Sequence, residues 1–212
     1  GPIGFLATPG PLIVGNTILG DHADAGIKIG QATGGRILGN TITGPDCSTS
    51  TGAIDLAPGE TNSIVDGNTI KSTRLGIVFG GLPRSFATGG NELRTSKVVI
   101  SNNTLNFISA IGFFSSDGTD DVLIEGNNVS LDTGAPTSTQ CFNLSPTAAG
   151  SGGADFNRTR ILGNTCVGFE TGIYLPGTGA LGFPSAQILG NYVSTSGTIG
   201  TGIHLENANT SI

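Results

Sequence analysis

Acidic residues near the middle of the chain are the first candidates for chemistry. Residues 117–121 read Asp-Gly-Thr-Asp-Asp, Glu125 follows closely, and Asp66 stands in an earlier segment of similar wording. Two carboxyl groups about 5–10 Å apart can hydrolyse a glycosidic bond, one as the acid and the other as the base or nucleophile. We therefore name Asp66, Asp121 and Glu125 as candidate catalytic residues. Two other interpretations stay open, because Asp-Gly sequences favour turns and grouped carboxylates can bind a hard cation.

Polar, basic and aromatic residues form a second set that could contact a substrate. One group recurs at a single position of a repeated motif described below and comprises Asp55, Asn143, Tyr174 and His204. The other group stands in or beside the two longest insertions and comprises Arg84, Arg94 and Arg158. Polar side chains suit sugar hydroxyls, and aromatic rings suit the apolar faces of sugar rings. The alternative is that these are ordinary solvated positions.

Composition limits the class of protein. The chain has 212 residues, of which 11% are charged, with nine Lys and Arg and a net charge of −6. So few charges argue against helical bundles, and the shortage of basic residues argues against a nucleic-acid partner. No apolar run approaches the roughly 20 residues of a membrane-spanning helix, so we expect no membrane insertion.

The three cysteines are Cys47, Cys141 and Cys166. Their spacing fits no metal-binding pattern, and their odd number does not suggest a complete disulfide framework. We therefore expect three free thiols, no metal site built from cysteine, and no cofactor.

A repeated hexapeptide decides the architecture. The wording Ile-x-Gly-Asn-Thr-Ile occurs seven times with small changes, and its central asparagines are Asn16, Asn40, Asn68, Asn103, Asn127, Asn164 and Asn191. Successive copies are 24 to 37 residues apart. A constant minimum spacing, with longer spacings between some copies, is typical of a fixed structural unit that carries loop insertions.

A second motif, a small residue followed by apolar-x-apolar, stands between the copies. Examples are residues 26–29, 53–56, 110–113 and 172–175. Alternation with a period of two predicts strands with one buried face. Each repeat therefore contains three short strands, and we predict an all-β parallel solenoid of about seven coils. Equivalent residues stack along its axis, and the outward positions of the second motif read Lys28, Asp55, Val78, Gly112, Asn143, Tyr174 and His204.

The repeated asparagine has two expected roles. Asparagine tolerates the left-handed backbone that a corner between strands needs. Its side-chain amide can also bond to the equivalent residue of the next coil, which forms an asparagine ladder and satisfies buried polar groups.

These motifs resemble the right-handed parallel β-helix superfamily, which includes pectate lyases, polygalacturonases, mannuronan epimerases and phage tailspikes. The resemblance covers about residues 3–205 and implies right-handed winding, with a substrate groove outside the strands of the second motif. The catalytic motifs of the enzyme families are missing, so their catalytic residues are not transferred to this chain. The likeness is greatest to the β-helix part of a tailspike.

We expect one β-helix domain over residues 1–212, with residues 1–2 as a tag remnant and the chain as a piece of a longer protein. The resemblance implies a secreted or virion protein that binds, and in some members degrades, a cell-surface polysaccharide. The outward residues beside the Gly-Asn pairs include four apolar ones, which are either covered by loops or packed against two further copies in a homotrimer. The alternatives are a complete polysaccharide hydrolase or lyase, and a structural rod or adhesin stalk without a site.

Overall fold

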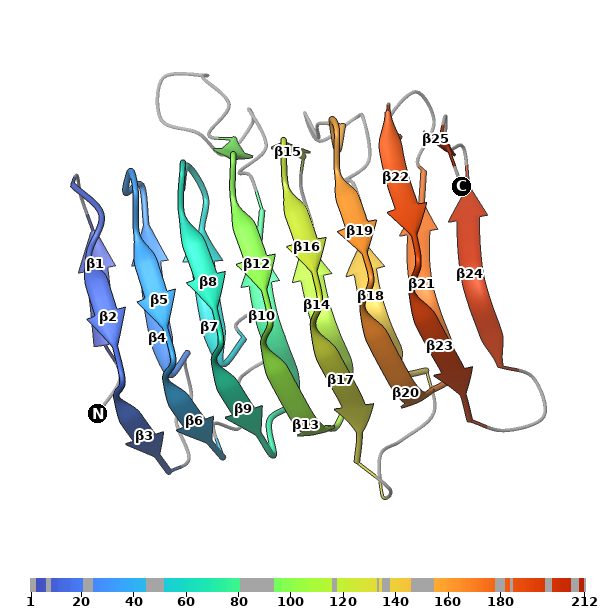
Figure 1. Ribbon diagram of the computed structural model, residues 1–212, viewed down its shortest axis with the longest axis horizontal. Coiled ribbons are helices and arrows are strands. Elements are labelled where there is room, and N and C mark those ends of the chain that lie inside the picture. Colours follow the sequence, from blue (N-terminus) through green and yellow to red (C-terminus); the bar gives the residue numbers. More distant parts are fainter. Residues whose placement is uncertain are drawn as a thin grey trace.

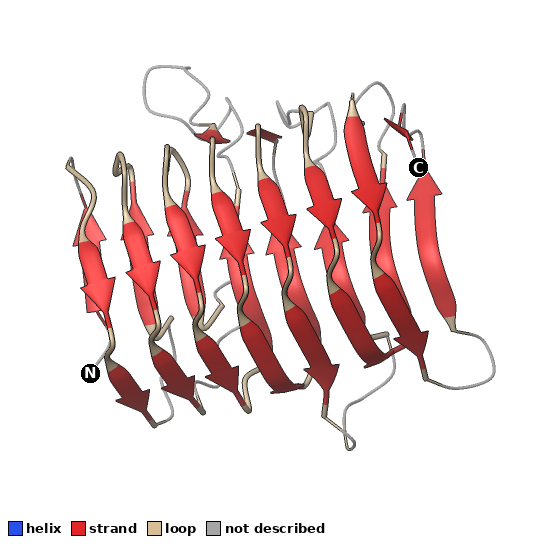
Figure 2. Cartoon of the chain, in the orientation of Figure 1, coloured by secondary structure: helices blue, strands red, loops and turns tan. Residues whose placement is uncertain are grey.

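The computed structural model describes residues 3–6, 9–20, 25–44, 52–80, 94–115, 118–132, 134, 138–145, 155–177, 182–183, 185–196, 200–206 and 210–211. These residues form strands and turns and contain no helix (Figure 2). Accordingly, the described part of the chain has no helix that could span a membrane.

Three parallel sheets, here named A, B and C, run the length of the molecule (Figure 1). Sheet A consists of β1 (Ile3–Leu6), β4 (Ile27–Gly30), β7 (Ile54–Ala57), β10 (Leu75–Phe79), β14 (Ile111–Ser115), β18 (Gln140–Leu144), β21 (Thr171–Pro176) and β24 (Thr201–Glu206). Sheet B consists of β2 (Leu12–Val14), β5 (Arg36–Leu38), β8 (Ile64–Asp66), β12 (Val99–Ser101), β16 (Leu123–Glu125), β19 (Arg160–Leu162), β22 (Ala186–Leu189) and β25 (Thr210–Ser211). Sheet C consists of β3 (Thr17–Leu19), β6 (Thr41–Thr43), β9 (Thr69–Lys71), β13 (Thr104–Ile108), β17 (Asn128–Leu131), β20 (Thr165–Phe169) and β23 (Tyr192–Thr195). The short strands β11 (Thr95–Ser96) and β15 (Thr119–Asp120) pair with each other at the corner between sheets A and B.

The chain passes through the sheets in the order B, C, A, and this order is repeated seven times from β2 to β24. We number these seven turns as coils 1 to 7; β1 precedes coil 1, and β25 follows coil 7. In Figure 1 the chain rises through sheet A at the back, descends through sheets B and C at the front, and advances from left to right, which is a right-handed turn. The predicted parallel β-helix of about seven three-stranded coils is therefore confirmed.

The core consists of columns of aliphatic side chains. In sheet B the central residue of each coil points inward, and the strand register aligns Ile13, Ile37, Val65, Ile100, Ile124, Ile161 and Ile188. The predicted column in sheet C is also in register, from Ile18 to Val193. Each fully buried aliphatic side chain contributes about 1.5–3 kcal/mol, so these columns are the main source of stability.

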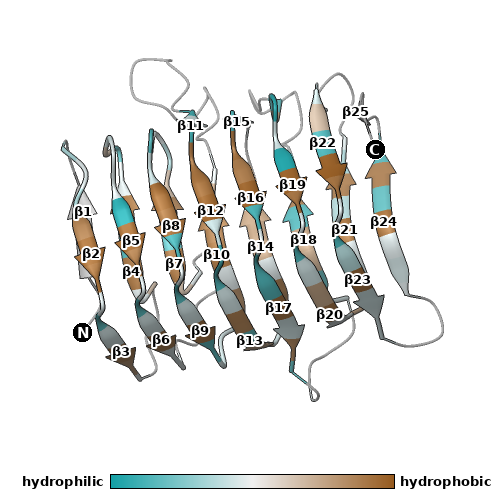
Figure 3. Cartoon of the chain, viewed as in Figure 1, coloured by the Kyte–Doolittle hydropathy of each residue, from teal (hydrophilic) through white to brown (hydrophobic). Residues whose placement is uncertain are grey.

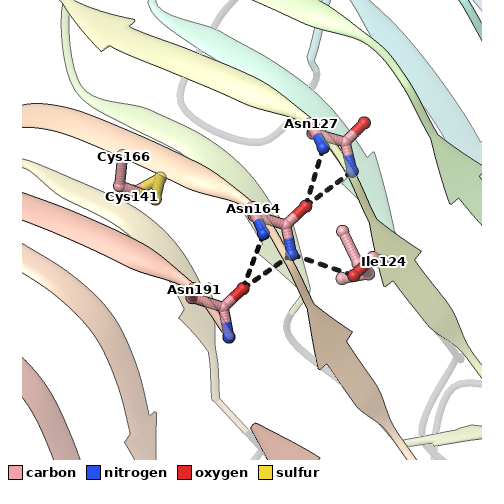
Figure 4. Close-up of a disulfide and its surroundings, with 6 residues drawn as sticks. All are labelled: Ile124, Asn127, Cys141, Asn164, Cys166 and Asn191. Carbon is pink, nitrogen blue, oxygen red and sulfur yellow. Dashed lines mark hydrogen bonds between the residues drawn. A yellow bond between two sulfur atoms is a disulfide. The ribbon is translucent and has the colours of Figure 1, made fainter. Parts of the chain in front are cut away.

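The asparagine ladder is present and its polar groups are fully used. The Nδ2 of Asn68 donates to Oδ1 of Asn103 at 2.9 Å, and the backbone N–H of Asn68 donates to the same oxygen at 2.9 Å. Nδ2 also donates to the carbonyl of Ile37 in the previous coil at 2.9 Å. The same pattern runs from Asn16 to Asn191, and Figure 4 shows its last two steps.

The left-handed residue of each corner is not the asparagine, so that part of the prediction is wrong. The residue before it has a positive φ, for example 66° at Gly15 and 63° at Gly67. Glycine reaches this conformation without steric cost. In coil 4 the same position is occupied by Asn102, with φ 52°. Glycine therefore makes the turn, and the following asparagine is left with an ordinary backbone and a side chain free to form the ladder.

One residue of the outward row in sheet A was also assigned wrongly. Val78 pairs with Phe114, and Phe114 pairs with Asn143, so Phe114 takes the place expected for Gly112. Gly112 instead lies at the inner corner, where a side chain would collide with Val129. The outward row therefore carries an aromatic ring in coil 4.

The expectation of three free thiols is wrong for two of the cysteines. Cys141 in β18 and Cys166 in β20 form a buried disulfide between coils 5 and 6 (Figure 4). In neighbouring coils the facing pairs are Gly112 with Val129 and Gly172 with Val193, where the glycine leaves room for the aliphatic side chain. Two cysteines thus replace a glycine and an aliphatic residue at this place in the core. Cys47 lies outside the described residues.

A carboxyl group is buried at the corner between sheets A and B. The side chain of Glu60 is fully buried; its Oε2 accepts from the backbone N–H of Ala32 at 3.1 Å, and Ser63 Oγ bonds to Oε1. Burial raises the pKa of Glu60 above its ordinary value, and the two hydrogen bonds only partly oppose this shift. The folded protein therefore binds the Glu60 proton more tightly than the unfolded chain does.

This raised pKa predicts a pH-dependent stability. The contribution of Glu60 is complete below the pKa of the unfolded chain and is lost as the pH rises through the higher pKa of the folded state. We expect Glu60→Gln, which stays neutral and whose side chain can accept from Ala32 N–H through its oxygen and donate to Ser63 Oγ through its amide nitrogen, to raise the unfolding midpoint at neutral pH. The difference should shrink near the ordinary glutamate pKa of about 4.3. Equal midpoints for variant and wild type at neutral pH would contradict the assignment.

Candidate functional site

The outer face of sheet A carries the row of residues that the second motif predicts. Strand register places Lys28, Asp55, Val78, Phe114, Asn143, Tyr174 and His204 on consecutive coils. Parallel strands are about 4.8 Å apart, so neighbouring members of the row are close enough to contact one extended ligand. We call the four residues of coils 4 to 7, Phe114, Asn143, Tyr174 and His204, the sheet A row.

Each polar member of the sheet A row is held by a neighbour. Asn143 Nδ2 donates to Gln140 Oε1 at 2.5 Å, and Asn143 Oδ1 accepts from Ser145 Oγ at 2.8 Å. The edge of one ring faces the other in the pair Tyr174 and His204, whose ring centroids are 5.1 Å apart. All four side chains of the row are partly exposed.

Each end of this face carries a pair of ionisable side chains in contact. In coils 1 and 2, Lys28 Nζ lies 3.1 Å from Asp55 Oδ2 in an ion pair, and Asp55 is buried. In coil 7, His204 Nε2 lies 2.9 Å from Glu206 Oε1. The predicted contact residue Asp55 therefore belongs to an ion pair at the N-terminal end, three coils from Asn143, whereas Asn143, Tyr174 and His204 are on consecutive coils.

Two of the three candidate catalytic residues share a row on the outer face of sheet B. Asp66 pairs with Ser101, and Ser101 pairs with Glu125, so the carboxylates are two coils apart. Two strand spacings amount to about 10 Å between backbones. Asp66 Oδ1 accepts from Ser101 Oγ at 2.7 Å and from Asn102 Nδ2 at 2.9 Å. These bonds orient the Asp66 carboxylate between coils 3 and 4.

Asp121 is not brought beside Glu125. It precedes β16 at the corner, whereas Glu125 is the last residue of that strand. Arg158 holds Asp121 in a two-pronged ion pair, with Nε at 2.5 Å from Oδ1 and Nη2 at 2.9 Å from Oδ2. The hydrogen bond from Arg158 lowers the pKa of Asp121, helped by the charges of Arg160 and Lys97. A carboxyl group with a lowered pKa is poorly suited to donate a proton as a general acid.

Arg94 connects three coils at the same corner. Its Nε lies 2.6 Å from Asp120 Oδ2, and its Nη2 donates to the backbone carbonyl of Asp155 at 2.6 Å. Asn157 Nδ2 donates to Asp120 Oδ1 at 2.7 Å. Arg94 and Arg158 are thus both engaged with aspartates, while Arg84 lies outside the described residues. Within the described ranges, no three His, Cys, Asp or Glu side chains form a group that could hold a metal ion.

Sheet B also carries exposed apolar side chains on its outer face, among the charged residues of the same face. Leu12, Val14 and Leu189 are 69%, 52% and 50% exposed, and Ile64 and Leu123 between them are partly exposed. In Figure 3 the strands of this sheet carry both brown and teal segments, and the brown includes the buried aliphatic column of the core. Leu12 and Val14 lie in coil 1 and Leu189 in coil 7, and the row between them includes Asp66 and Glu125.

Two important residues were not found from the sequence. Phe114 was missed because it stands two residues beyond the residue that fits the motif. Gly112 is a second small residue from which the motif could start, but the sequence does not decide between the two alignments. Glu60 was missed because it lies at a corner, outside the alternating strand pattern.

Fold and surface together define a parallel β-helix protein with a polar and aromatic row on one sheet and some exposed apolar residues on another. Comparison with protein-family models, curated proteins and solved structures gave no match to this chain.

Proposed function

We propose that the chain is the polysaccharide-binding β-helix region of a tailspike-like or secreted protein, and that the glycan lies along the sheet A row. The observation that carries this proposal is the alignment of Phe114, Asn143, Tyr174 and His204 on four consecutive coils. Two aromatic rings, an amide and an imidazole in one line offer stacking surfaces and hydrogen-bonding groups at regular intervals. An extended polymer of sugar units would meet them one after another.

The geometry of this face supports an extended ligand. Strands of a β-helix are rigid, so side chains on them are held in place before binding and little conformational entropy is lost. Asn143 is oriented by Gln140 and Ser145, and His204 by Tyr174 and Glu206. The proposal is therefore a preorganised row rather than a closed pocket.

Removal of Tyr174 should weaken glycan binding. We expect Tyr174→Ala to reduce affinity about tenfold or more for the polysaccharide that the wild type binds best, because a central aromatic contact is lost. The measurement is calorimetric titration against a panel of bacterial capsular and O-antigen polysaccharides. Tyr192→Ala is the matched control, since Tyr192 is a tyrosine 61% exposed on sheet C. Equal affinity for both variants would refute the sheet A row as the site.

A polysaccharide hydrolase is the second candidate, and the shared row of Asp66 and Glu125 favours it. A separation of roughly 6.5–9.5 Å between carboxyl groups is typical of enzymes that invert the anomeric centre. The same panel should be assayed for new reducing ends and for unsaturated sugars, with Glu125→Gln as the inactive variant. Binding without cleavage supports a receptor-binding protein, whereas neither binding nor cleavage favours a structural rod.

We also propose that the outer face of sheet B packs in a homotrimer and that the protein is located outside the cytosol, secreted or on a virion. Exposed Leu12, Val14 and Leu189 support the first point. The buried disulfide between Cys141 and Cys166 supports the second, because disulfides persist in oxidising compartments. Light scattering on the binding samples should give three chain masses; a single chain mass at micromolar concentration would rule out the trimer.

A further inference from the structure

Phe107 combines two features that rarely occur together. Its φ is 59°, in the left-handed region, and its side chain is 51% exposed. An exposed phenylalanine alone is unremarkable on a protein surface. A bulky residue with a left-handed backbone is a genuine outlier, and such strain gathers where function requires it.

The local structure explains the backbone but not the ring. In the pairing of β13 with β17, Leu105 lies opposite Val129 and Ile108 opposite Leu131, so coil 4 contains one extra residue at a β-bulge. The bulge turns Ile108 into the core, where it is fully buried. The residue at this position is left-handed in coils 1 to 3 as well, at Gly20, Gly44 and Ser72, so the turn at the end of sheet C needs that conformation. Nothing in this geometry needs an aromatic side chain.

Coil 6 contains the same bulge built with glycine. Val167 lies opposite Ser194 and Phe169 opposite Thr195, which leaves Gly168 as the extra residue, with φ 89°. Phe169 is buried as Ile108 is. Glycine therefore suffices for the fold, and phenylalanine at the equivalent position of coil 4 carries a steric cost that the fold does not require.

The neighbours of Phe107 offer polar groups on three consecutive coils. Asn106 pairs with Lys71 of coil 3, and Ser130 Oγ of coil 5 donates to Asn106 Oδ1 at 3.2 Å. Among the described residues, neither the Asn106 amide N–H₂ nor the Lys71 ammonium group has a hydrogen-bond or ion-pair partner. An oriented amide donor beside an exposed ring is the combination that a sugar unit requires, since the ring packs against its C–H face and the amide bonds to an oxygen.

We propose that Phe107, with Asn106, forms a second saccharide-contact site at the end of sheet C, separate from the sheet A row. The inference rests on the proposed function, because it takes the ligand class, a polysaccharide, from it. It concerns a different face of the β-helix. The ring is exposed at the bulge, and Ser130 orients the amide of the preceding residue. A polysaccharide bound at both places would contact two faces of the same rod.

The absence of tryptophan from the chain allows each face to be tested by itself. Phe107→Trp and Tyr174→Trp each introduce a single fluorophore, one at the sheet C site and one in the sheet A row. Both variants are titrated with oligosaccharides prepared from the polysaccharide panel. We expect saturable emission changes in both. A response of Tyr174→Trp alone overturns the second site, a response of Phe107→Trp alone overturns the sheet A row, and silence of both overturns both.

A glycine variant separates strain from recognition. We expect Phe107→Gly to raise the unfolding midpoint by a few degrees, because it relieves the left-handed strain, while affinity for the responding oligosaccharide falls about tenfold. Ser72→Gly is the matched control, since Ser72 is exposed with φ 54° in coil 3. It should raise the midpoint without changing affinity. Unchanged affinity in Phe107→Gly overturns the proposal even if the protein becomes more stable.

Discussion

Replacement of Asn103 by alanine is expected to lower the free energy of unfolding by about 3 kcal/mol or more. Asn103 is the central asparagine of the ladder, and its side chain is buried. Its Oδ1 accepts from the backbone N–H and Nδ2 of Asn68, and its own Nδ2 donates to Val65 O and Asn127 Oδ1. Alanine leaves several of these groups buried without a partner, and each such group costs about 1–3 kcal/mol.

Denaturant unfolding followed by circular dichroism measures this loss of free energy. The same loss corresponds to a thermal unfolding midpoint lower by roughly 5–10 °C. Asn128→Ala is the control, because Asn128 is exposed on the outer face of sheet C in the next coil. The control should unfold like the wild type. If the Asn103 variant also unfolded like the wild type, the ladder would contribute little and the aliphatic columns alone would hold the coils together.

The second large effect concerns the disulfide. We expect Cys141→Ser combined with Cys166→Ser to reduce stability by about 3 kcal/mol, because the bond closes a segment of 25 residues and two hydroxyl groups replace it in the core. The double variant Cys141→Gly and Cys166→Val should be the more stable of the two. It recreates the pair found at Gly112 and Val129 and loses only the covalent link.

The comparison of these two double variants is the decisive measurement. If glycine and valine gave no advantage over the two serines, the neighbouring coils would not be structurally equivalent at this place. The disulfide of the folded wild type should also resist reduction, since Cys141 and Cys166 are fully buried.

The repeated hexapeptide allowed most of the fold to be predicted. Like residues recur at like positions, and the period of two distinguishes inward from outward, so the columns from Ile13 to Ile188 and from Ile18 to Val193 followed directly. The ladder from Asn16 to Asn191 followed for the same reason. A repeat shows which residues all coils share, and the stacking of the coils depends on those shared residues.

The alignment of coil 4 in sheet A could not be obtained in this way. Both Gly112 and Phe114 have the parity of an outward position, because a shift of two residues keeps every side chain on the same face. Only the pairing of Phe113 with Ile77 and Phe142 decides between the two alignments. The aromatic residue of the sheet A row therefore became visible only in three dimensions.

Among the candidate site residues, too, some could be placed from the repeat and others only from the structure. Asp66 and Glu125 were placed in one row correctly, because both occupy the same position of the repeat. Asp121 was named with them as a catalytic candidate, but it lies at the corner before β16, with φ 55°, whereas Glu125 is the last residue of that strand. Its partner is Arg158 from the next coil, reached through a segment whose length no repeat specifies.

The sequence by itself determined the repeating unit, the inward and outward faces, and the ladder. Tertiary structure alone decided the disulfide between Cys141 and Cys166, the burial of Glu60 and the strained position of Phe107. The physical reason is that these features depend on which parts of different strands meet across the core or at a corner. A pattern along one strand reports only whether a residue is inside or outside, and contacts between sheets depend on how the whole coil closes.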